Sequence, residues 1–247
     1  MTTVWIRAVL DHPIFTASIA SIRRELAERA AADALLAGRL QAMSPLQRDV
    51  LERCIHSSGD LTITADLVVE PAEDGATAAE ACRQGLEALQ AGAPILCDTA
   101  MATAAVAPMA RRTLGNPVHC LLDWAPLVAP PGSTRSAAAI DGAWAALAGV
   151  GPRGQGPGPI VLIGSAPTAL ERLLDLVAAG APPPALVIGM PVGFIGVAES
   201  KRRLAASALC QIRLDGPRGG AGLAGAACNA LLRAAALQAA MGARSPS

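Results

Sequence analysis

The chain has 247 residues, a length that suits one large domain with a sizeable core. Hydrophobic residues make up 52% of the chain and charged residues 16%, which indicates an ordered globular protein and excludes an intrinsically disordered one. Twenty basic residues balance twenty acidic residues and aromatic residues reach only 2%, so the composition argues against nucleic acid or an anionic membrane as a partner.

The N-terminal quarter of the chain is expected to be helical. A long helix is predicted over 18–37. A further helix begins after Ser44, because Ser44 can cap a helix, Pro45 suits the first helical position and Gln47 completes a capping box. Gly59 is expected to end this second helix.

His56 is the histidine around which a helix geometry can be argued. The apolar residues of its helix recur at about 100° per residue and form one stripe: Leu46, Val50, Leu51, Cys54 and Ile55. On the helical wheel His56 lies roughly opposite this stripe, and Arg53 is its neighbour one turn earlier. The pair is therefore expected to face a cleft, a partner or water. A solvated surface histidine remains the open alternative.

The rest of the chain alternates helices with short apolar strands. Helices are expected over 77–91, 134–147, 168–179, 198–206 and 221–241. Strands are expected over 94–98, 118–122, 160–163, 185–188 and 209–214, a surface loop over 149–159, and either strand or helix over 61–70. Apolar strands separated by helices indicate a three-layer α/β/α fold with a mainly parallel sheet, preceded here by the helical N-terminal segment.

These elements are expected to form a single domain. Its helical part covers about 12–60, its α/β part covers about 61–241, and 242–247 form a disordered tail. The six cysteines show neither a C-x-x-C pair nor a zinc-ligand spacing, so buried free thiols and no protein-bound metal are expected. The apolar runs are interrupted before a membrane-spanning length and no signal peptide is recognised, which predicts a cytoplasmic protein.

Ligand chemistry is expected at the carboxyl ends of the parallel strands. Three glycine-containing loops follow strands there, at 164–168, 189–194 and 216–220. Small residues let a ligand approach the backbone, and free N–H groups at a helix start favour carboxylates or phosphates. No loop has the spacing of a phosphate-binding fingerprint, which makes a nucleotide-binding enzyme a weaker alternative. Ordinary strand-to-helix turns are also compatible with these loops.

Four arginines lie near predicted helix caps or helix faces: Arg23, Arg53, Arg135 and Arg218. A guanidinium group matches a carboxylate with two parallel hydrogen bonds. The four positions therefore suggest a ligand with several carboxylates.

Seven ordered groups of motifs resemble one family, the precorrin-8X methylmutases, over about residues 5 to 235. They are SIASIRRE at 18–25, RCIH at 53–56, GAPILCD at 92–98 with Met101, TRSAAA at 134–139, APTAL at 166–170, GMPVGF at 189–194 with AESK at 198–201, and GG at 219–220 with NAL at 229–231. The chain has Ser165 where the family usually has Asn, and Ala221 where it usually has Ser.

The resemblance implies an isomerase of cobalamin biosynthesis that moves a methyl group from C-11 to C-12 of precorrin-8X, or of its cobalt form, and gives hydrogenobyrinic acid. It makes His56 the proton donor and acceptor, with Ser18 and Arg53 as substrate-binding residues. It implies no cofactor, and a homodimer with the site near the subunit interface. Because the substrate carries many carboxylates, further contacts are expected at Arg23, Thr134, Arg135, Ser136, Ser165, Thr168, Gly219 and Gly220. A non-catalytic corrinoid-binding paralogue is the alternative.

Overall fold

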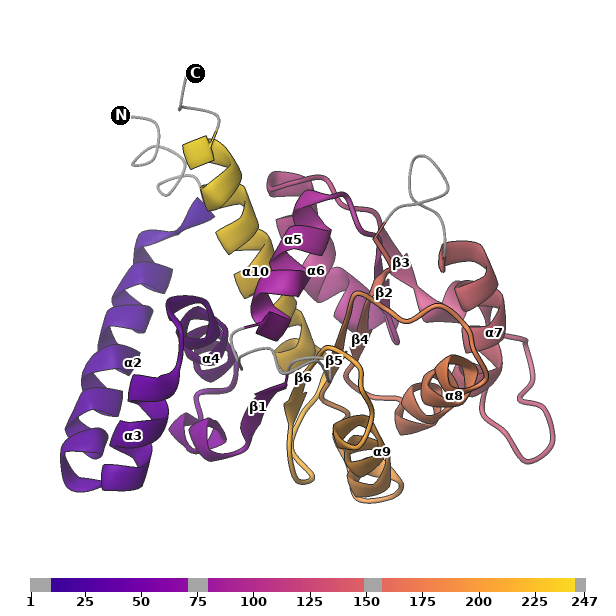
Figure 1. The fold of residues 1–247 in the computed structure, drawn as a ribbon, viewed down its shortest axis with the longest axis horizontal. Helices are drawn as coiled ribbons and strands as arrows, with labels where there is room; N and C mark the ends of the chain where they lie inside the picture. Colours follow the sequence, from indigo (N-terminus) through magenta and orange to yellow (C-terminus); the bar gives the residue numbers. More distant parts are fainter. Residues whose placement is uncertain (1–9, 71–79, 149–156, 243–247) are drawn as a thin grey trace.

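The computed structural model of the chain describes residues 10–70, 80–148 and 157–242. Within these residues, six strands form one sheet in the order β1-β6-β5-β4-β2-β3 (Figure 1). The strands are β1 (Leu67–Glu70), β2 (Ile95–Cys97), β3 (Val118–Cys120), β4 (Ile160–Ile163), β5 (Leu186–Gly189) and β6 (Gln211–Leu214). Neighbouring strands run parallel except β1, which pairs antiparallel with β6. The predicted mainly parallel sheet is confirmed.

Helices cover both faces of the sheet. They are α2 (Pro13–Ala32), α3 (Ala34–Ala42), α4 (Pro45–Ser58), α5 (Glu80–Gln90), α6 (Ala100–Arg112), α7 (Arg135–Leu147), α8 (Pro167–Ala178), α9 (Val197–Ala205) and α10 (Ala221–Gly242). Ile160 and Leu162 of β4 pack with α4, α5, α6 and α10, whereas Val161 and Ile163 pack with α7, α8 and α9. Because side chains of a strand alternate between its two faces, the sheet is buried on both sides, as the three-layer prediction requires.

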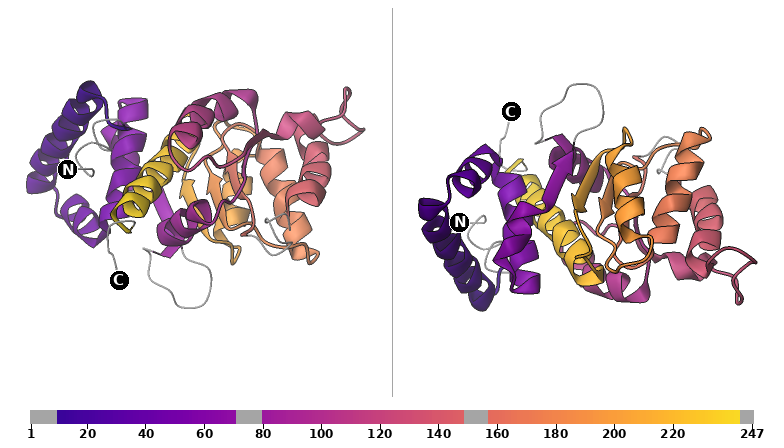
Figure 2. Two further views of the ribbon diagram at one scale, coloured as in Figure 1. Left: turned by 90° about the horizontal axis from the view of Figure 1, so that it is seen from above. Right: turned by 90° about the horizontal axis from the view of Figure 1, so that it is seen from below.

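The helical N-terminal part lies at one end of the molecule. Both views of Figure 2 place α2 and α3 at this end and α7 and α8 at the other. Helix α4 packs against α10, and α10 lies on the sheet, so α4 connects the N-terminal part to the α/β part.

The predicted elements of the α/β part are confirmed to within a residue or two at their described ends. The ambiguous stretch 61–70 contains both a 3-10 helix η1 (Leu61–Ala65) and strand β1. The strand predicted over 118–122 ends at Cys120, and the chain continues as a second 3-10 helix, η2 (Leu121–Trp124). The start of the helix predicted over 77–91, most of the loop predicted over 149–159 and most of the predicted tail lie outside the described residues.

The prediction of a single helix over 18–37 is wrong, because the helix is interrupted at Asp33. Asp33 takes an extended conformation (φ −133°, ψ 100°), and its carboxylate accepts hydrogen bonds of 3.0 Å from the N–H groups of Leu35 and Leu36. The side chain therefore caps a new helix, α3. The alanine-rich sequence on both sides favours helix, and only the capping role of Asp33 marks the break.

By length and composition alone, helix α10 could cross a membrane. The sequence pattern predicts instead that every apolar run is interrupted before that length. However, 67% of its apolar window is buried inside the fold. Its small residues allow close packing: a Cβ added at Gly225 would lie 2.9 Å from the Cβ of Ala105 on α6. Helix α10 is therefore a core helix of this domain.

All six cysteines are free thiols, as predicted. Five are buried, and Cys120 is half-buried. Burial raises the pKa of Cys54 to about 12. A thiol with such a pKa carries little thiolate at neutral pH, so Cys54 is unsuited to nucleophilic chemistry.

Candidate active site

Helix α4 carries the candidate catalytic histidine and begins and ends as predicted. The N–H of Gln47 donates to Ser44 Oγ at 3.2 Å, and the N–H of Ser44 donates to Gln47 Oε1 at 2.8 Å. Gly59 ends the helix in the left-handed conformation (φ 69°), where glycine is favoured. The predicted stripe faces the core and leaves His56 exposed on the opposite side of the helix.

His56 is held by helix α2. Ser18 Oγ lies 2.8 Å from His56 Nδ1, and the Phe15 ring meets the imidazole edge-on, with 5.1 Å between ring centroids. Phe15 and Ser18 lie three residues apart on α2, as do Arg53 and His56 on α4, so one face of each helix meets the other. Helix α2 therefore covers part of the Arg53/His56 face, while His56 stays exposed beside a pocket, as expected. With Nδ1 engaged, Nε2 is the nitrogen available to a ligand.

Arg53 is a half-buried cation that forms no ion pair with the residues the structure describes. Its guanidinium carbon lies 4.6 Å from the centroid of the Phe15 ring. Burial lowers the pKa of Arg53. Arg53 and His56 line the same pocket of about 390 Å³. Its lining residues are Leu10, His12, Pro13, Phe15, Arg53, His56 and Arg112. A desolvated guanidinium without a carboxylate partner is suited to an anionic ligand.

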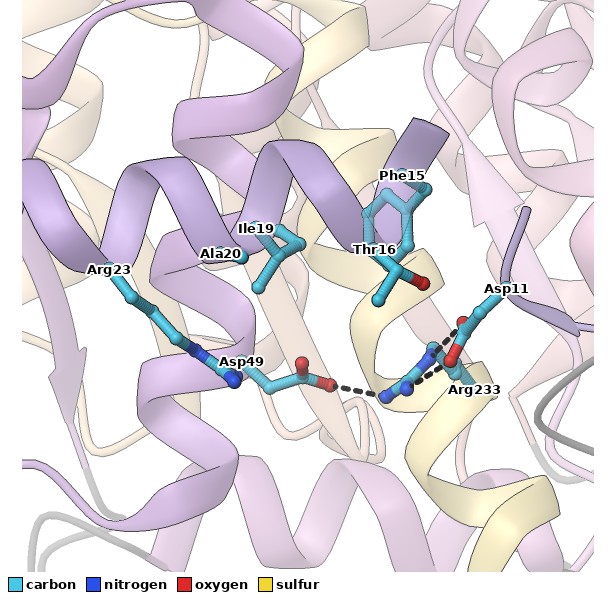
Figure 3. A pocket seen from close by; sticks show the side chains of 8 residues that line it. All are labelled: Asp11, Phe15, Thr16, Ile19, Ala20, Arg23, Asp49 and Arg233. Carbon is cyan, nitrogen blue, oxygen red and sulfur yellow. Dashed lines mark hydrogen bonds and ion pairs between the residues drawn. The ribbon is translucent and has the colours of Figure 1, made fainter. Parts of the chain in front are cut away.

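A neighbouring pocket of about 580 Å³ is lined by charged groups that neutralise each other (Figure 3). Arg233 donates to both carboxylate oxygens of Asp11, at 2.6 and 2.5 Å, and to Asp49 at 3.3 Å. Arg23 points into the same pocket but forms two hydrogen bonds, of 2.8 and 2.7 Å, with the buried carboxylate of Glu52. A substrate carboxylate would have to share Arg23 with this partner.

The loop after β4 is held by a buried carboxylate. Asp98 Oδ2 accepts hydrogen bonds from three consecutive backbone N–H groups, those of Gly164 at 3.0 Å, Ser165 at 2.6 Å and Ala166 at 2.8 Å. Burial raises the pKa of Asp98, and the three N–H groups act in the opposite direction. This role of Asp98 was not predicted, although an acidic residue directly after a buried strand is a visible signal.

Three loops at this edge of the sheet form one unit, which we call the loop wall: 164–168, 189–196 and 216–220. The N–H of Val192 donates to the carbonyl of Gly164 at 3.2 Å, and the N–H of Gly193 to the carbonyl of Pro217 at 3.0 Å. The N–H of Gly220 donates to the carbonyl of Met190 at 2.8 Å. The loops after β4, β5 and β6 are thus linked by backbone hydrogen bonds.

Two cations fix the last of these loops. Lys201 Nζ donates to the carbonyls of Gly216 and Arg218, at 2.7 Å each. Burial lowers the pKa of Lys201 to about 8. The side chain of Arg218 forms ion pairs with Asp60 at 2.5 Å and with Asp66. Arg218 is therefore neutralised by carboxylates of its own chain.

The remaining predicted contacts lie at the starts of α7 and α8. Thr134 Oγ1 caps α7 and lies 2.7 Å from Thr168 Oγ1 on the first turn of α8. Arg135 Nε donates to the carbonyl of Pro126 at 2.8 Å, and Ser136 is half-buried on the first turn of α7. Free N–H groups and the positive ends of two helix dipoles meet here, which favours anions.

The predicted site residues fall into two groups within one chain. The helix group contains Ser18, Arg23, Arg53 and His56. The loop group contains Thr134, Arg135, Ser136, Ser165, Thr168, Gly219 and Gly220. The pocket at His56 is lined by no member of the loop group. The start of α10 connects the two groups, because Ser57 Oγ donates to the carbonyl of Gly222 at 3.4 Å.

Replacing Asp98 by alanine is expected to destabilise the protein through the loop wall. The substitution leaves three N–H groups without their acceptor, and each unpaired buried donor costs about 1–3 kcal/mol. We expect the free energy of unfolding in urea to fall by about 3 kcal/mol. Asp123→Ala, which removes an exposed carboxylate in η2, is the control and should change it by less than about 0.5 kcal/mol. Equal stabilities of the two variants would contradict the role of Asp98.

Comparison with known proteins identifies the family. The precorrin-8X methylmutase family model matches residues 13–234. The chain is 34% identical to a cobalt-precorrin-8 methylmutase of Synechocystis sp. over 90% of this chain and 95% of that protein. It is 43% identical to a precorrin-8X methylmutase of Pseudomonas aeruginosa over 72% of this chain and 80% of that protein.

A solved structure agrees with this assignment. The crystal structure of a precorrin-8X methylmutase from Thermus thermophilus is 38% identical and superposes with a TM-score of 0.63, covering 78% of this chain and 88% of that one. The family model spans both the helix group and the loop group. The chain therefore belongs to the precorrin-8X methylmutase family, isomerases of cobalamin biosynthesis.

Proposed function

We propose that the chain moves a methyl group from C-11 to C-12 of precorrin-8X, with His56 as the proton donor and acceptor. The observation that carries the proposal is the exposed His56 imidazole, which lines a pocket beside Arg53 while Ser18 holds Nδ1; Arg53 forms no ion pair with a described residue. The burial of the apolar helix α10 within the fold supports a cytoplasmic enzyme.

The chemistry needs one proton that is given and taken back, because substrate and product of an isomerisation have the same composition. Protonation near the migrating centre makes the ring electron-poor and favours the methyl shift. His56 Nε2 has no hydrogen-bond partner among the described residues and can serve as this acid and base. Arg53 is suited to hold a substrate carboxylate beside it.

Turnover measured by absorbance tests the proposal and the identity of the substrate. Relatives in this family carry both the precorrin-8X and the cobalt-precorrin-8 name, so both forms are offered separately. We expect conversion of precorrin-8X to hydrogenobyrinic acid, and the form with the higher kcat/KM identifies the preferred substrate. Binding without turnover of either form would instead favour the corrinoid-binding paralogue, the alternative motivated by Ser165 and Ala221.

We further propose that a second copy of the chain completes the site. The helix group and the starts of α7 and α8 lie toward opposite ends of one chain (Figure 1 and Figure 2). Exposed apolar side chains occur in the loops and helix start that follow strands β2, β3 and β5: Met101, Leu127, Val128, Val192, Phe194 and Ile195. Such exposed apolar groups are typical of an interface. A two-fold dimer would bring the loop group of one subunit to the helix group of its partner.

The assembly is tested by sedimentation. At micromolar concentration the protein should sediment at about twice the chain mass of 24.9 kDa. Ile195→Asp should dissociate the dimer and abolish turnover, because it buries an unpaired charge in the interface. Leu35→Asp is the matched control on α3, where the side chain is 88% exposed compared with 91% for Ile195. A monomeric wild-type protein with full activity would contradict the shared site.

A further inference from the structure

The pocket at His56 contains two arginines and no carboxylate. Arg53 and Arg112 both line it, and neither forms an ion pair with a residue that the structure describes. Arg23, Arg218 and Arg233 are different, because each is paired with at least one carboxylate of the chain. Among the described residues no carboxylate forms an ion pair with either arginine of this pocket, and Asp49 and Asp11 act on Arg53 only from the neighbouring pocket.

Three further features make the pocket attractive to an anion. Burial lowers the pKa of Arg53, and the Arg112 charge lies close enough to lower it further, against the raising effect of Asp49 and Asp11. The pocket also lies at the start of α2, where the helix dipole is positive. Finally, His12 Nδ1 accepts the N–H of Ile14 at 3.2 Å, so a neutral His12 carries its proton on Nε2 and is a donor there.

We propose that Arg112 and His12, together with Arg53, form a subsite for one side-chain carboxylate of the tetrapyrrole, directly beside His56. The inference rests on the proposed function and extends it by adding two residues to the binding site. A guanidinium on each of α4 and α6 holds the carboxylate between them. The anchored side chain then sets the position of the ring relative to the His56 imidazole, which makes Arg112 a positioning residue.

The test compares two adjacent arginines at the end of α6. Arg112→Gln is the variant, and Arg111→Gln is the matched control, because Arg111 is also exposed but does not line the pocket. Binding of hydrogenobyrinic acid is followed by absorbance titration. Arg112→Gln should raise the Kd about 5- to 30-fold, as expected for a partly exposed charge-assisted contact. Arg112→Lys should recover part of the loss, and Arg111→Gln should stay within about twofold.

A second ligand shows whether a carboxylate is the group that is recognised. With the fully methyl-esterified product, Arg112→Gln and Arg111→Gln should have the same Kd, because this ligand carries no negative charge. Equal Kd values of both variants for the free acid, or an undiminished difference with the ester, would overturn the subsite. If the wild-type protein neither binds the acid nor turns over precorrin-8X, the proposed function itself fails, which is a distinguishable result.

Discussion

We expect His56→Ala to lower the rate of methyl migration by about 10²- to 10⁴-fold while the protein still binds hydrogenobyrinic acid. The range is what loss of a positioned general acid typically costs. His56 lines the pocket, and its Nδ1 is held by Ser18 of helix α2, which leaves Nε2 to act on the substrate. The substitution removes the proton donor but keeps the arginine that we expect to bind the substrate.

The measurement is single-turnover absorbance with precorrin-8X, followed by titration with the product. His119→Ala is a useful control, because His119 does not line the pocket and instead packs against Trp124, with 5.9 Å between the ring centroids. The single-turnover rate of Ser18→Ala should lie between those of the wild type and His56→Ala, since the substitution frees Nδ1 of His56 without removing the imidazole. Near wild-type turnover by His56→Ala would exclude it as the proton donor.

The second large effect is expected at Arg53. Arg53→Ala should raise the Kd for hydrogenobyrinic acid about 10- to 150-fold, which corresponds to about 1.5–3 kcal/mol for a desolvated charge-assisted hydrogen bond. Arg53 is a stronger candidate than Arg23, because Arg23 already pairs with Glu52. The contact over Phe15 should hold the guanidinium plane in place before the ligand arrives.

Arg53→Lys separates charge from geometry. A lysine keeps the positive charge but loses the planar fork, so it should recover only part of the affinity. Phe15→Leu is a companion variant that keeps an apolar side chain and removes the ring beneath Arg53. We expect it to weaken binding less than Arg53→Ala does. A Kd that is unchanged in both Arg53 variants would place this arginine outside the site.

Local sequence signals were sufficient where the contacts are local. The start and end of α4 depend on Ser44, Gln47 and Gly59, which act within a turn of their own positions, and both ends are confirmed. The break at Asp33 follows the same capping rule, but the alanine-rich flanks concealed it. Competition between propensity and a single cap is decided by packing, which the pattern does not contain.

The contacts of the site are long-range and were not visible in the sequence. His56 was placed correctly off the apolar stripe, but Ser18 reaches it across 38 residues, and the resemblance implied Ser18 only as a substrate-binding residue. Asp98 binds N–H groups 66 to 68 residues further along the chain. Arg112 gave no signal, because helix α6, which carries it, was itself not predicted from the sequence.

The links between the three loops also determine how the site can fluctuate. A loop that exchanges backbone hydrogen bonds with its neighbours cannot open alone, so local unfolding at 164–168, 189–196 or 216–220 should involve all three as one cooperative unit. The free energy of opening is then that of the whole wall. A ligand that docks there meets groups already in place, so little entropy is lost in ordering the protein on binding.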